Sequence, residues 1–402
     1  MTTTINNEHK KLNVPNLRFT EFQGEWRKCK LGDLCNVLMC KRILASQTNT
    51  EEGIPFYKIG TIGNAPDAYI SKELFDDYKT KYNYPHKGEV MITCAGTVGK
   101  CVIYDGKDSY YQDSNIVWID NPSQHINNGF LYHLLANVNW RKLNSTTIIR
   151  IYNDDLRNLK LSYPQIEEQK KISRLLSLLD ERIATQNKII DKLQSLIKGL
   201  NDTLYAQHSD EVMTSFAELG TSYSGLSGKS AQDFGSGKPF ITYLNVYSNN
   251  IINKNDFQYV AIKDGEKQNI VEYGDVLFTL SSETPNEVGI GSVFLGKEKV
   301  YLNSFCFGIH ITNKEVAFSP YLSYYVSSTA FRKFIYPYAQ GSTRFNLCKA
   351  DFEKASIKLP TLENQKRIYS ILSHIDNKII TERQMLDLYN SQKQYLLRQM
   401  FI

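Results

Sequence analysis

The chain repeats one phrase after 196 residues, and this repeat restricts the possible folds more than any other feature of the sequence. "PQIEEQKKI" begins at Pro164, and "PTLENQKRI" begins at Pro360. Residues 164–185 and 360–381 are identical at ten of 22 positions. The period is too long for a solenoid, whose repeats span about 20–50 residues. It therefore indicates a duplicated module, in which each copy is a globular domain followed by a helix.

Segments upstream of the phrase are repeated as well, at slightly different offsets. They are rich in β-branched and aromatic residues and are bounded by Gly, Pro and Asn, a pattern typical of strands and turns. The changing offsets indicate loops of different length on one scaffold. The pairs are "GIPFYKIGTI" (53–62) with "GKPFITYLNV" (237–246), "GEVMIT" (88–93) with "GDVLFT" (274–279), and "TVGKCVIY" (97–104) with "EVGIGSVF" (287–294).

Each repeated phrase also predicts the start of a long helix. Proline suits the first helical position, and Glu167 and Glu168 suit the positive end of the helix dipole. Behind each opening, apolar residues recur at alternating steps of four and three, as in a heptad seam with a few polar layers such as Gln186, Glu382 and Lys393. The residues predicted to pair the helices are Ile172, Leu176, Leu179, Ile183, Ile190, Leu193, Ile197, Leu200, Ile368, Leu372, Ile375, Ile379, Leu386 and Leu396.

A single apolar seam usually marks a helix that lies on its own domain. Two matching seams behind two matching domains favour helices that pair with each other, in a pseudo-twofold arrangement. The predicted fold class is α+β, with two similar globular domains separated by two long helices that form an antiparallel intramolecular coiled coil. The predicted ranges are 1–163 and 208–359 for the domains, and 164–207 and 360–402 for the helices.

The composition is typical of a globular protein in a reducing, cytoplasmic environment. The 402 residues are 42% apolar and 22% charged, and the net charge of +5 permits an anionic partner without requiring one. The seven cysteines are odd in number and lack CxxC spacing, which argues against a disulfide framework or a structural zinc. A polar start and the lack of a run of about 18 apolar residues argue against a signal peptide and a membrane span.

Motifs that resemble catalytic ones are incomplete. "GLSGKS" (225–230) lacks the glycine that a phosphate loop needs five positions before Gly228, where Tyr223 stands. "DFG" (233–235) has no catalytic-loop HRD beside it, and "DNPS" (120–123) has only one proline and no aromatic residue of the amino-methyltransferase loop. The seven histidines are scattered, so neither a metal site nor a catalytic triad is predicted. The sequence therefore predicts a protein without catalytic residues, metal or cofactor of its own, suited to recognition at two places.

Several segments together resemble the specificity (S) subunit of Type I restriction–modification enzymes, over essentially the whole chain. "VPNLRFTEFQGEW" (14–26), followed by "KLGDL", resembles that family's entry into its first target-recognition domain. "GDVLFTLSSETPNEVG" (274–289) and "GSTRFNLCKADFEKASIKLP" (341–360) resemble core segments of the second. The two openings of the form P-x-x-E-x-Q-K/R-I resemble the two conserved helical regions.

The resemblance implies a DNA-binding subunit of a restriction system. In that family each target-recognition domain reads one half of a split sequence in double-stranded DNA, and the paired helices fix the gap and dock two methyltransferase (M) subunits. Those subunits bind S-adenosylmethionine and methylate adenine at N6. Two restriction (R) subunits use ATP and Mg to translocate and cleave DNA. The specificity subunit itself is implied to be non-catalytic.

Polar residues in loops between the paired strand segments are the predicted DNA contacts, because Lys and Arg bind phosphates and polar side chains reach base edges. A solvated loop residue is the ordinary alternative for each of them. "STTIIRIYN" (145–153) does not closely reproduce "GSTRFN" (341–346), so the two domains are expected to contact DNA differently. The candidates are Arg42, Lys58, Thr61, Asn64, Thr97, Lys100, Arg150 and Asn153 in the first domain, and Lys229, Tyr243, Asn245, Ser281, Ser282, Thr284, Arg344 and Asn346 in the second.

A second function class stays open at the level of the sequence. A coiled-coil scaffold could organise protein partners without reading DNA. The shared framework with different loops, and surfaces rich in Lys, Arg, Asn, Ser and Tyr, favour recognition of nucleic acid over such a scaffold. Selection of bound duplexes from a random pool distinguishes the two, since only a reader enriches a split motif.

Overall fold

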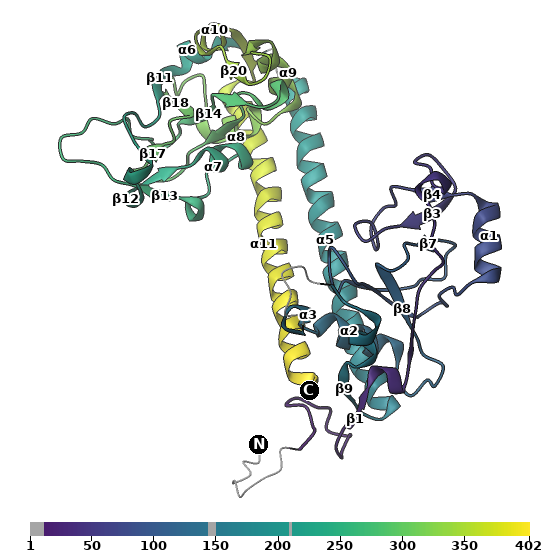
Figure 1. The fold of residues 1–402 in the computed structure, drawn as a ribbon. Coiled ribbons are helices and arrows are strands. Elements are labelled where there is room, and N and C mark those ends of the chain that lie inside the picture. The colour runs from purple at the N-terminus through teal and green to yellow at the C-terminus, as the bar shows by residue number, and fades with distance from the viewer. Residues whose placement is uncertain (1–11, 144–149, 209–210) are drawn as a thin grey trace, which may run out of the picture. The chain divides into compact units, whose positions relative to one another are not determined.

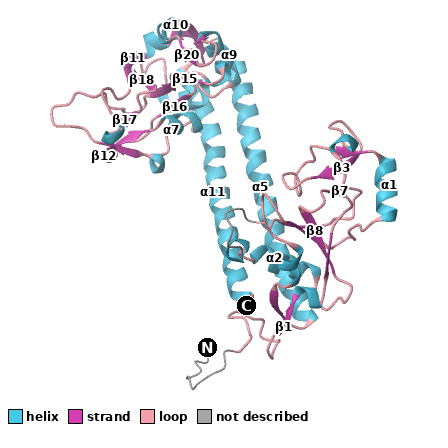
Figure 2. Cartoon of the chain, in the orientation of Figure 1, coloured by secondary structure: helices cyan, strands magenta, loops and turns pink. Residues whose placement is uncertain are grey.

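The computed structural model describes residues 12–143, 150–208 and 211–402 (Figure 1). The chain divides into two compact units. Residues 1–187 and 385–402 form the first unit, and residues 188–384 form the second. Figure 2 shows that short strands joined by loops make up most of each globular part, whereas the two longest elements are helices. Within the described ranges, no helix has both the length and the apolar character of a membrane span.

The first unit contains a four-stranded antiparallel sheet, a small mixed sheet and a strand pair. The large sheet has the order β2 (Asn36–Leu38), β8 (Ile116–Asp120), β5 (Val90–Thr93) and β6 (Cys101–Ile103). The small sheet has the order β4 (Tyr69–Ile70), β3 (Ile54–Tyr57) and β7 (Tyr110–Tyr111), and β1 (Arg27–Lys30) pairs with β9 (Lys160–Tyr163). Its short helices are α1 (Lys72–Lys81), α2 (Asn128–Asn137), α3 (Trp140–Leu143) and α4 (Asn153–Arg157), with 3-10 turns at Leu31–Asp33 and Ala45–Gln47.

The second unit repeats these sheets in the same order and adds one. Its large sheet is β11 (Gly220–Ser224), β18 (Cys306–Ile311), β14 (Val276–Thr279) and β16 (Gly291–Val293). Its small sheet is β13 (Gln258–Val260), β12 (Phe234–Ile241) and β17 (Tyr301–Leu302), and β10 (Val212–Ser215) pairs with β21 (Ser356–Leu359). The added sheet is β15 (Ser281–Ser282), β20 (Phe345–Leu347) and β19 (Ala339–Gln340). The helices are α6 (Phe216–Leu219), α7 (Tyr243–Ser248), α8 (Ser319–Tyr325), α9 (Thr329–Ile335) and α10 (Lys349–Lys354), with 3-10 turns at Ala231–Asp233, Lys254–Asp256, Pro285–Glu287 and Tyr336–Tyr338.

The duplication extends to the register of the strands. Thr93 of β5 lies opposite Ile116 of β8, and Thr279 of β14 lies opposite Cys306 of β18. In both units the small sheet contains one parallel pair, formed by β3 with β7 and by β12 with β17. The α+β fold with two similar globular domains, predicted from the repeated segments, is therefore confirmed.

A glycine at the start of each repeated "GxPF" segment is required by the backbone. Gly53 has a φ of 129° and Gly237 has a φ of 109°, a region that L-residues with side chains rarely adopt. A Cβ on Gly53 would lie 2.4 Å from the carbonyl oxygen of Ile70, and a Cβ on Gly237 would lie 2.5 Å from that of Val260. The repeated glycine thus lets each strand approach its neighbour.

The two long helices, α5 (Ile166–His208) and α11 (Leu362–Met400), contribute to both units. In the first unit, Ile172 and Leu176 of α5 share a buried core with Leu396 and Leu397 of α11. Asp180 also forms an ion pair with Lys393, farther from the start of α5 and from the end of α11. This order of contacts makes the two helices antiparallel there.

The second unit contains the opposite ends of the same helices. Ile368 and Leu372 of α11 lie in its core, with Leu200 and Leu204 of α5 packed against them. All fourteen predicted helix-pairing residues are buried or half-buried, and their pairing stays a prediction. Each long helix therefore contributes to the core of the first unit at one end and to the core of the second unit at its other end.

A buried glutamine explains why the helix openings are repeated. The Nε2 of Gln169 donates hydrogen bonds to the carbonyl oxygens of Pro164 (2.8 Å) and His125 (3.0 Å), and its Oε1 accepts one from the N–H of Asn127 (2.7 Å). The side chain thus attaches the start of α5 to the loop before α2.

Gln365 makes the same three kinds of bond in the second unit. Its Nε2 donates to the carbonyl oxygens of Pro360 (2.8 Å) and Val316 (2.7 Å), and its Oε1 accepts from the N–H of Phe318 (2.8 Å). Both glutamine residues are fully buried. The repeated phrase therefore encodes one docking contact between a helix and its domain.

Candidate nucleic-acid interface

The candidate interface of the first unit lies where β5 ends. The N–H of Cys94 donates to the carbonyl oxygen of Asn115 at 2.8 Å, and the N–H of Ile151 donates to that of Cys94 at 2.9 Å. These bonds join three segments that are distant in the sequence. The loop after β7 and the segment before α4 are thereby held beside the end of β5.

The second unit has the same junction. The N–H of Leu280 donates to the carbonyl oxygen of Phe305 at 2.9 Å, and the N–H of Leu347 donates to that of Leu280 at 2.8 Å. Leu347 therefore occupies the place of Ile151. The residues just before them, Asn346 and Arg150, are equivalent positions with different side chains.

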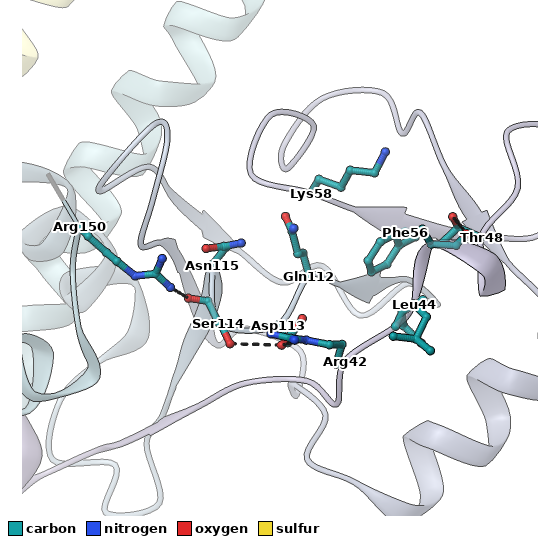
Figure 3. Close-up of a pocket in the computed structure, with 12 residues that line it drawn as sticks. Arg42, Leu44, Thr48, Phe56, Lys58, Gln112, Asp113, Ser114, Asn115 and Arg150 are labelled. Atoms are coloured by element: carbon teal, nitrogen blue, oxygen red, sulfur yellow. Dashed lines mark hydrogen bonds and ion pairs between the residues drawn. The ribbon is translucent and has the colours of Figure 1, made fainter. Parts of the chain in front are cut away.

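A pocket of about 480 Å³ opens at this junction in the first unit (Figure 3). Three of the predicted DNA-contact residues, Arg42, Lys58 and Arg150, line it. We call it the Arg42 pocket. Its other lining residues are Ile43, Leu44, Ala45, Thr48, Phe56, Gln112, Asp113, Ser114 and Asn115.

Two arginine side chains are tied to one loop beside the Arg42 pocket. The Nε of Arg42 donates to Oδ2 of Asp113 at 2.8 Å, and the Oγ of Ser114 donates to the same oxygen at 3.2 Å. The Nη2 of Arg150 donates to the carbonyl oxygen of Ser114 at 3.2 Å. Figure 3 shows the two arginine residues reaching the Asp113–Ser114 step from two directions. The arrangement orients cationic donors toward an open pocket, which suits an electron-rich ligand.

Lys58 lines the pocket and begins a short loop. The Nζ of Lys58 lies 3.2 Å from Oδ1 of Asp67. Thr61 accepts a hydrogen bond from the N–H of Lys58 at 3.0 Å, and the Nζ of Lys100 donates to the carbonyl oxygen of Ile62 at 2.6 Å. Thr61 and Lys100 therefore use these groups to close the loop.

Like Thr61 and Lys100, the remaining three predicted residues of the first domain are not among those that line the Arg42 pocket. Asn64 lines a separate hollow of about 310 Å³ with Tyr57 and Tyr111. Asn153 begins α4 and lines a hollow of about 330 Å³ that it shares with Arg150. The carbonyl oxygen of Thr97 accepts a bond from the hydroxyl of Thr93. Residues 144–149, which contain most of "STTIIRIYN", lie outside the described residues.

Three predicted residues of the second unit gather around a fourth, Ser281. The hydroxyl of Tyr243 donates to the Ser281 carbonyl oxygen at 2.8 Å, and Nη2 of Arg344 donates to Ser281 Oγ at 3.2 Å. Asn346 lies opposite Ser281 in the added sheet. The guanidinium of Arg344 also lies 5.8 Å from the ring centre of Phe305, which is exposed. Arg344 is thus held by an aromatic ring, whereas Arg42 is held by a carboxylate.

Ser282 and Thr284 contact a carboxylate that the sequence did not single out. Their hydroxyl groups donate to Oε2 of Glu287 at 3.1 and 3.0 Å, and the hydroxyl of Tyr247 donates to its Oε1 at 2.7 Å. Hydrogen bonds from Tyr247, Thr284 and Ser282 lower the pKa of Glu287, so this half-buried carboxylate is anionic at neutral pH.

Lys229 and Asn245 are engaged inside the second unit. The side chain of Lys229 is nearly buried and donates to Glu266 and to the carbonyl oxygen of Ala261, both at 2.6 Å. Asn245 is 2% exposed, and its amide both donates to the carbonyl oxygen and accepts from the N–H of Asn253. Both side chains serve the fold in this structure.

Sequence reasoning missed the loop residues Gln112, Asp113 and Ser114. Two signals pointed to them. The loop directly follows a segment of the repeated scaffold, and it is longer by one residue than its counterpart, since β7 to β8 spans four linking residues and β17 to β18 spans three. A loop that varies in length at a fixed place on a repeated scaffold is where binding residues concentrate.

Comparison with protein families gives a match to both units. The model of the Type I restriction modification DNA specificity domain matches residues 23–195 and 224–388. A putative type I restriction enzyme specificity subunit of Haemophilus influenzae is 49% identical over 169 residues, which are 42% of this chain and 43% of that protein. A putative type I restriction enzyme MjaX specificity subunit of Methanocaldococcus jannaschii is 23% identical over 413 residues, covering 93% of this chain and 92% of that one. The chain thus spans less than half the length of the H. influenzae relative.

Two solved structures share the fold. The S subunit of a Type I restriction–modification system from M. genitalium has a TM-score of 0.57 at 15% identity, covering 97% of this chain and 99% of that one. A structure on complex assembly and conformational transition of the type I R-M system has a TM-score of 0.54 at 17% identity, with 92% and 96% covered. At these identities the likeness concerns the fold.

Proposed function

The chain belongs to the family of Type I restriction modification DNA specificity domains, and from this we propose that it reads a split DNA sequence, one half with each unit. The chain is a DNA sequence-recognition subunit of a Type I restriction system, and the scaffold function without DNA reading is not favoured. The finer assignment of one half-site to each unit rests on the duplication.

One observation carries that assignment. The two units have the same strand order and the same backbone junction, yet different side chains occupy equivalent places there, as with Arg150 and Asn346. Backbone geometry positions a reader on the duplex, and side chains at base edges select the sequence. Two units with the same backbone arrangement but different side chains at the junction are therefore suited to recognising two different half-sites.

The proposal extends to partners and catalysis. Two methyltransferase subunits with S-adenosylmethionine, and restriction subunits with ATP and Mg, supply the chemistry, and this chain acts as a non-catalytic subunit in the cytoplasm. Exposed apolar side chains on the long helices support a protein-binding role, since Leu196 of α5 is 51% exposed and Leu388 of α11 is 65% exposed. We propose that these faces contact the methyltransferase subunits and that the helices set the gap between half-sites.

Selection from a random duplex pool tests the proposal. The chain, purified with its methyltransferase subunits, is expected to enrich duplexes with two short motifs at a fixed gap. Exchange of residues 212–358 for the matching region of another family member is expected to change one motif and to leave the other unchanged. Enrichment of no split motif, or a change in both halves after the exchange, contradicts the proposal.

A further inference from the structure

Gln112 has a buried acceptor that lacks a donor. Gln112 lines the Arg42 pocket (Figure 3), and among the described residues its Oε1 has no hydrogen-bond partner. Its backbone is firmly placed, because its N–H donates to the carbonyl oxygen of Tyr57 at 2.9 Å. A buried polar atom without a partner is unfavourable and is rare in proteins. A ligand in the pocket that brings a hydrogen-bond donor would satisfy this acceptor.

Arg42 adds donors to the same pocket. Within the described residues it bonds only to Asp113, through Nε, so both Nη groups stay available. Its side chain is 65% exposed, whereas that of Asp113 is 16% exposed. The half-buried carboxylate of Asp113 thus fixes the direction of an accessible guanidinium. A fork of parallel N–H groups matches two neighbouring acceptors on one ligand.

Ser114 contacts Arg150 directly and Arg42 through Asp113, and its backbone is strained. Its φ is 58°, which is uncommon for a residue other than glycine. In this conformation its hydroxyl bonds to Asp113 and its carbonyl oxygen accepts from Arg150. Strain of this kind concentrates at ligand-binding sites, where the rest of the fold enforces it. The loop is thus held in one shape before any ligand arrives.

The equivalent place in the second unit has no orphaned acceptor. Asn303 occupies the position of Gln112, since its N–H donates to the carbonyl oxygen of Ile241 at 3.0 Å, as that of Gln112 does to Tyr57. The Oδ1 of Asn303, however, accepts from the N–H of Phe305 at 2.9 Å. The unsatisfied acceptor therefore belongs to the first unit alone and not to the shared scaffold.

We propose that the Arg42 pocket reads two adjacent bases of one half-site in the major groove. Arg42 donates to O6 and N7 of a guanine, and Oε1 of Gln112 accepts from the amino group of a neighbouring adenine or cytosine. This inference rests on the proposed function and assigns residues to it. A phosphate fits the pocket less well, because it offers no donor to Gln112 and meets the carboxylate of Asp113.

Base-substituted duplexes test the assignment. Wild-type complex with methyltransferase subunits first yields the split motif by selection. Binding to that duplex, and to duplexes with each base pair changed in turn, is then measured for R42A, R42K, Q112L and Q112E at several salt concentrations. R27A serves as a matched control, because Arg27 is an exposed arginine of the same unit in β1. The half-site read by the second unit is the internal control.

The expected results are specific to position. R42A and R42K weaken binding about tenfold to hundredfold and abolish discrimination at one G·C pair, with an unchanged salt slope. Q112L relaxes the preference at the adjacent pair, whereas Q112E keeps it, since glutamate retains the acceptor oxygen. R27A changes neither preference.

Two outcomes overturn the inference. A uniform loss for R42A across all sequences, with a salt slope reduced by about one, identifies a phosphate contact instead. Unchanged preferences in every Arg42 and Gln112 variant remove both residues from base reading. In either case a split motif for the wild type leaves the proposed function standing. A wild type without a split motif overturns both.

Discussion

Asp180 and Asp376 occupy equivalent places in the two units but have different partners. Each lies 11 residues after the docking glutamine, Gln169 or Gln365, of its helix. Asp180 pairs with Lys393 and lies 4.0 Å from a ring nitrogen of His133. Asp376 accepts a hydrogen bond from the hydroxyl of Tyr324. The docking glutamine thus has the same backbone partners in both units, whereas the aspartate has different side-chain partners.

The histidine–tyrosine difference has an electrostatic consequence. His133 in α2 and Tyr324 in α8 are structurally equivalent, because both follow the backbone N–H bound by the docking glutamine at the same distance in sequence. Burial, opposed by Asp180 and reinforced by Lys393, lowers the pKa of His133 to about 4. The first unit thus contains a buried group that resists protonation, and the second contains a phenol in its place.

Loss of a docking glutamine is expected to have the largest effect. Q169L or Q365L leaves one N–H and two carbonyl groups without their partner, at about 1–3 kcal/mol for each buried group, or about 4 kcal/mol for the variant. Denaturant unfolding of each full-length variant measures the loss. Q194L, at an exposed position of α5, is the control and is expected to change stability by less than about 0.5 kcal/mol. Unequal losses for Q169L and Q365L would show that the two docking contacts are not energetically equivalent.

Acidification is expected to weaken the first unit through His133. Because the folded pKa of about 4 lies below the ordinary value of 6.5, the unfolded chain binds the proton more readily, and stability falls as the pH drops from about 6.5 to 4. The full difference corresponds to about 3 kcal/mol. H133Y, which copies the second unit, is expected to lose this part of the pH slope, measured by unfolding at a series of pH values. H125Q is the control at an exposed histidine, and an unchanged slope in H133Y would contradict the prediction.

Arg150 and Asn346 occupy equivalent positions at the two junctions, but Arg150 is charged whereas Asn346 is polar and neutral. R150A is expected to weaken DNA binding by about 1–2 kcal/mol, because a cation near the phosphates is lost, and to reduce the salt slope by about one. N346A is expected to leave the salt slope unchanged and to affect only the second half-site. Titration of both variants with the selected duplex, at several salt concentrations, checks this. Equal salt slopes for R150A and N346A would contradict this prediction.

Replacement of Lys393 is expected to have the smallest effect on the free energy of unfolding. Residue 197, the position in α5 that matches Lys393 in α11, is isoleucine, so K393I makes the first unit resemble the second. The ion pair with Asp180 is partly exposed, with side chains 22% and 33% accessible, and such pairs contribute about 0.5 kcal/mol. Unfolding measurements should show a loss of that size, together with a higher pKa of His133 by NMR titration. A loss above about 2 kcal/mol would mean that the pair is essential to the first unit.

The sequence predicted the helices and strands of the two units better than it predicted the Arg42 pocket. Apolar spacing revealed the seams of α5 and α11, and repeated β-branched segments revealed β3, β5, β12 and β14, because periodicity is a local signal. The Arg42 pocket combines residues around 42, 58, 112 and 150, and only the pairing of the strands brings them together. Polarity alone also could not show that Asn245 is buried or that Gln112 lacks a donor. Both facts depend on neighbours that are far away in the chain.

The discontinuity of the first unit sets an order of assembly on the ribosome. Residues 188–384 are contiguous and can close as soon as they emerge, whereas the first unit needs Leu396, Leu397 and Met400 to complete its core. At about 5–20 residues per second, these residues are made on the order of ten to forty seconds after residue 187. The part of the polypeptide that is synthesised first is therefore the last to mature, and a message truncated near its 3′ end yields a protein whose amino-terminal half is the one left open.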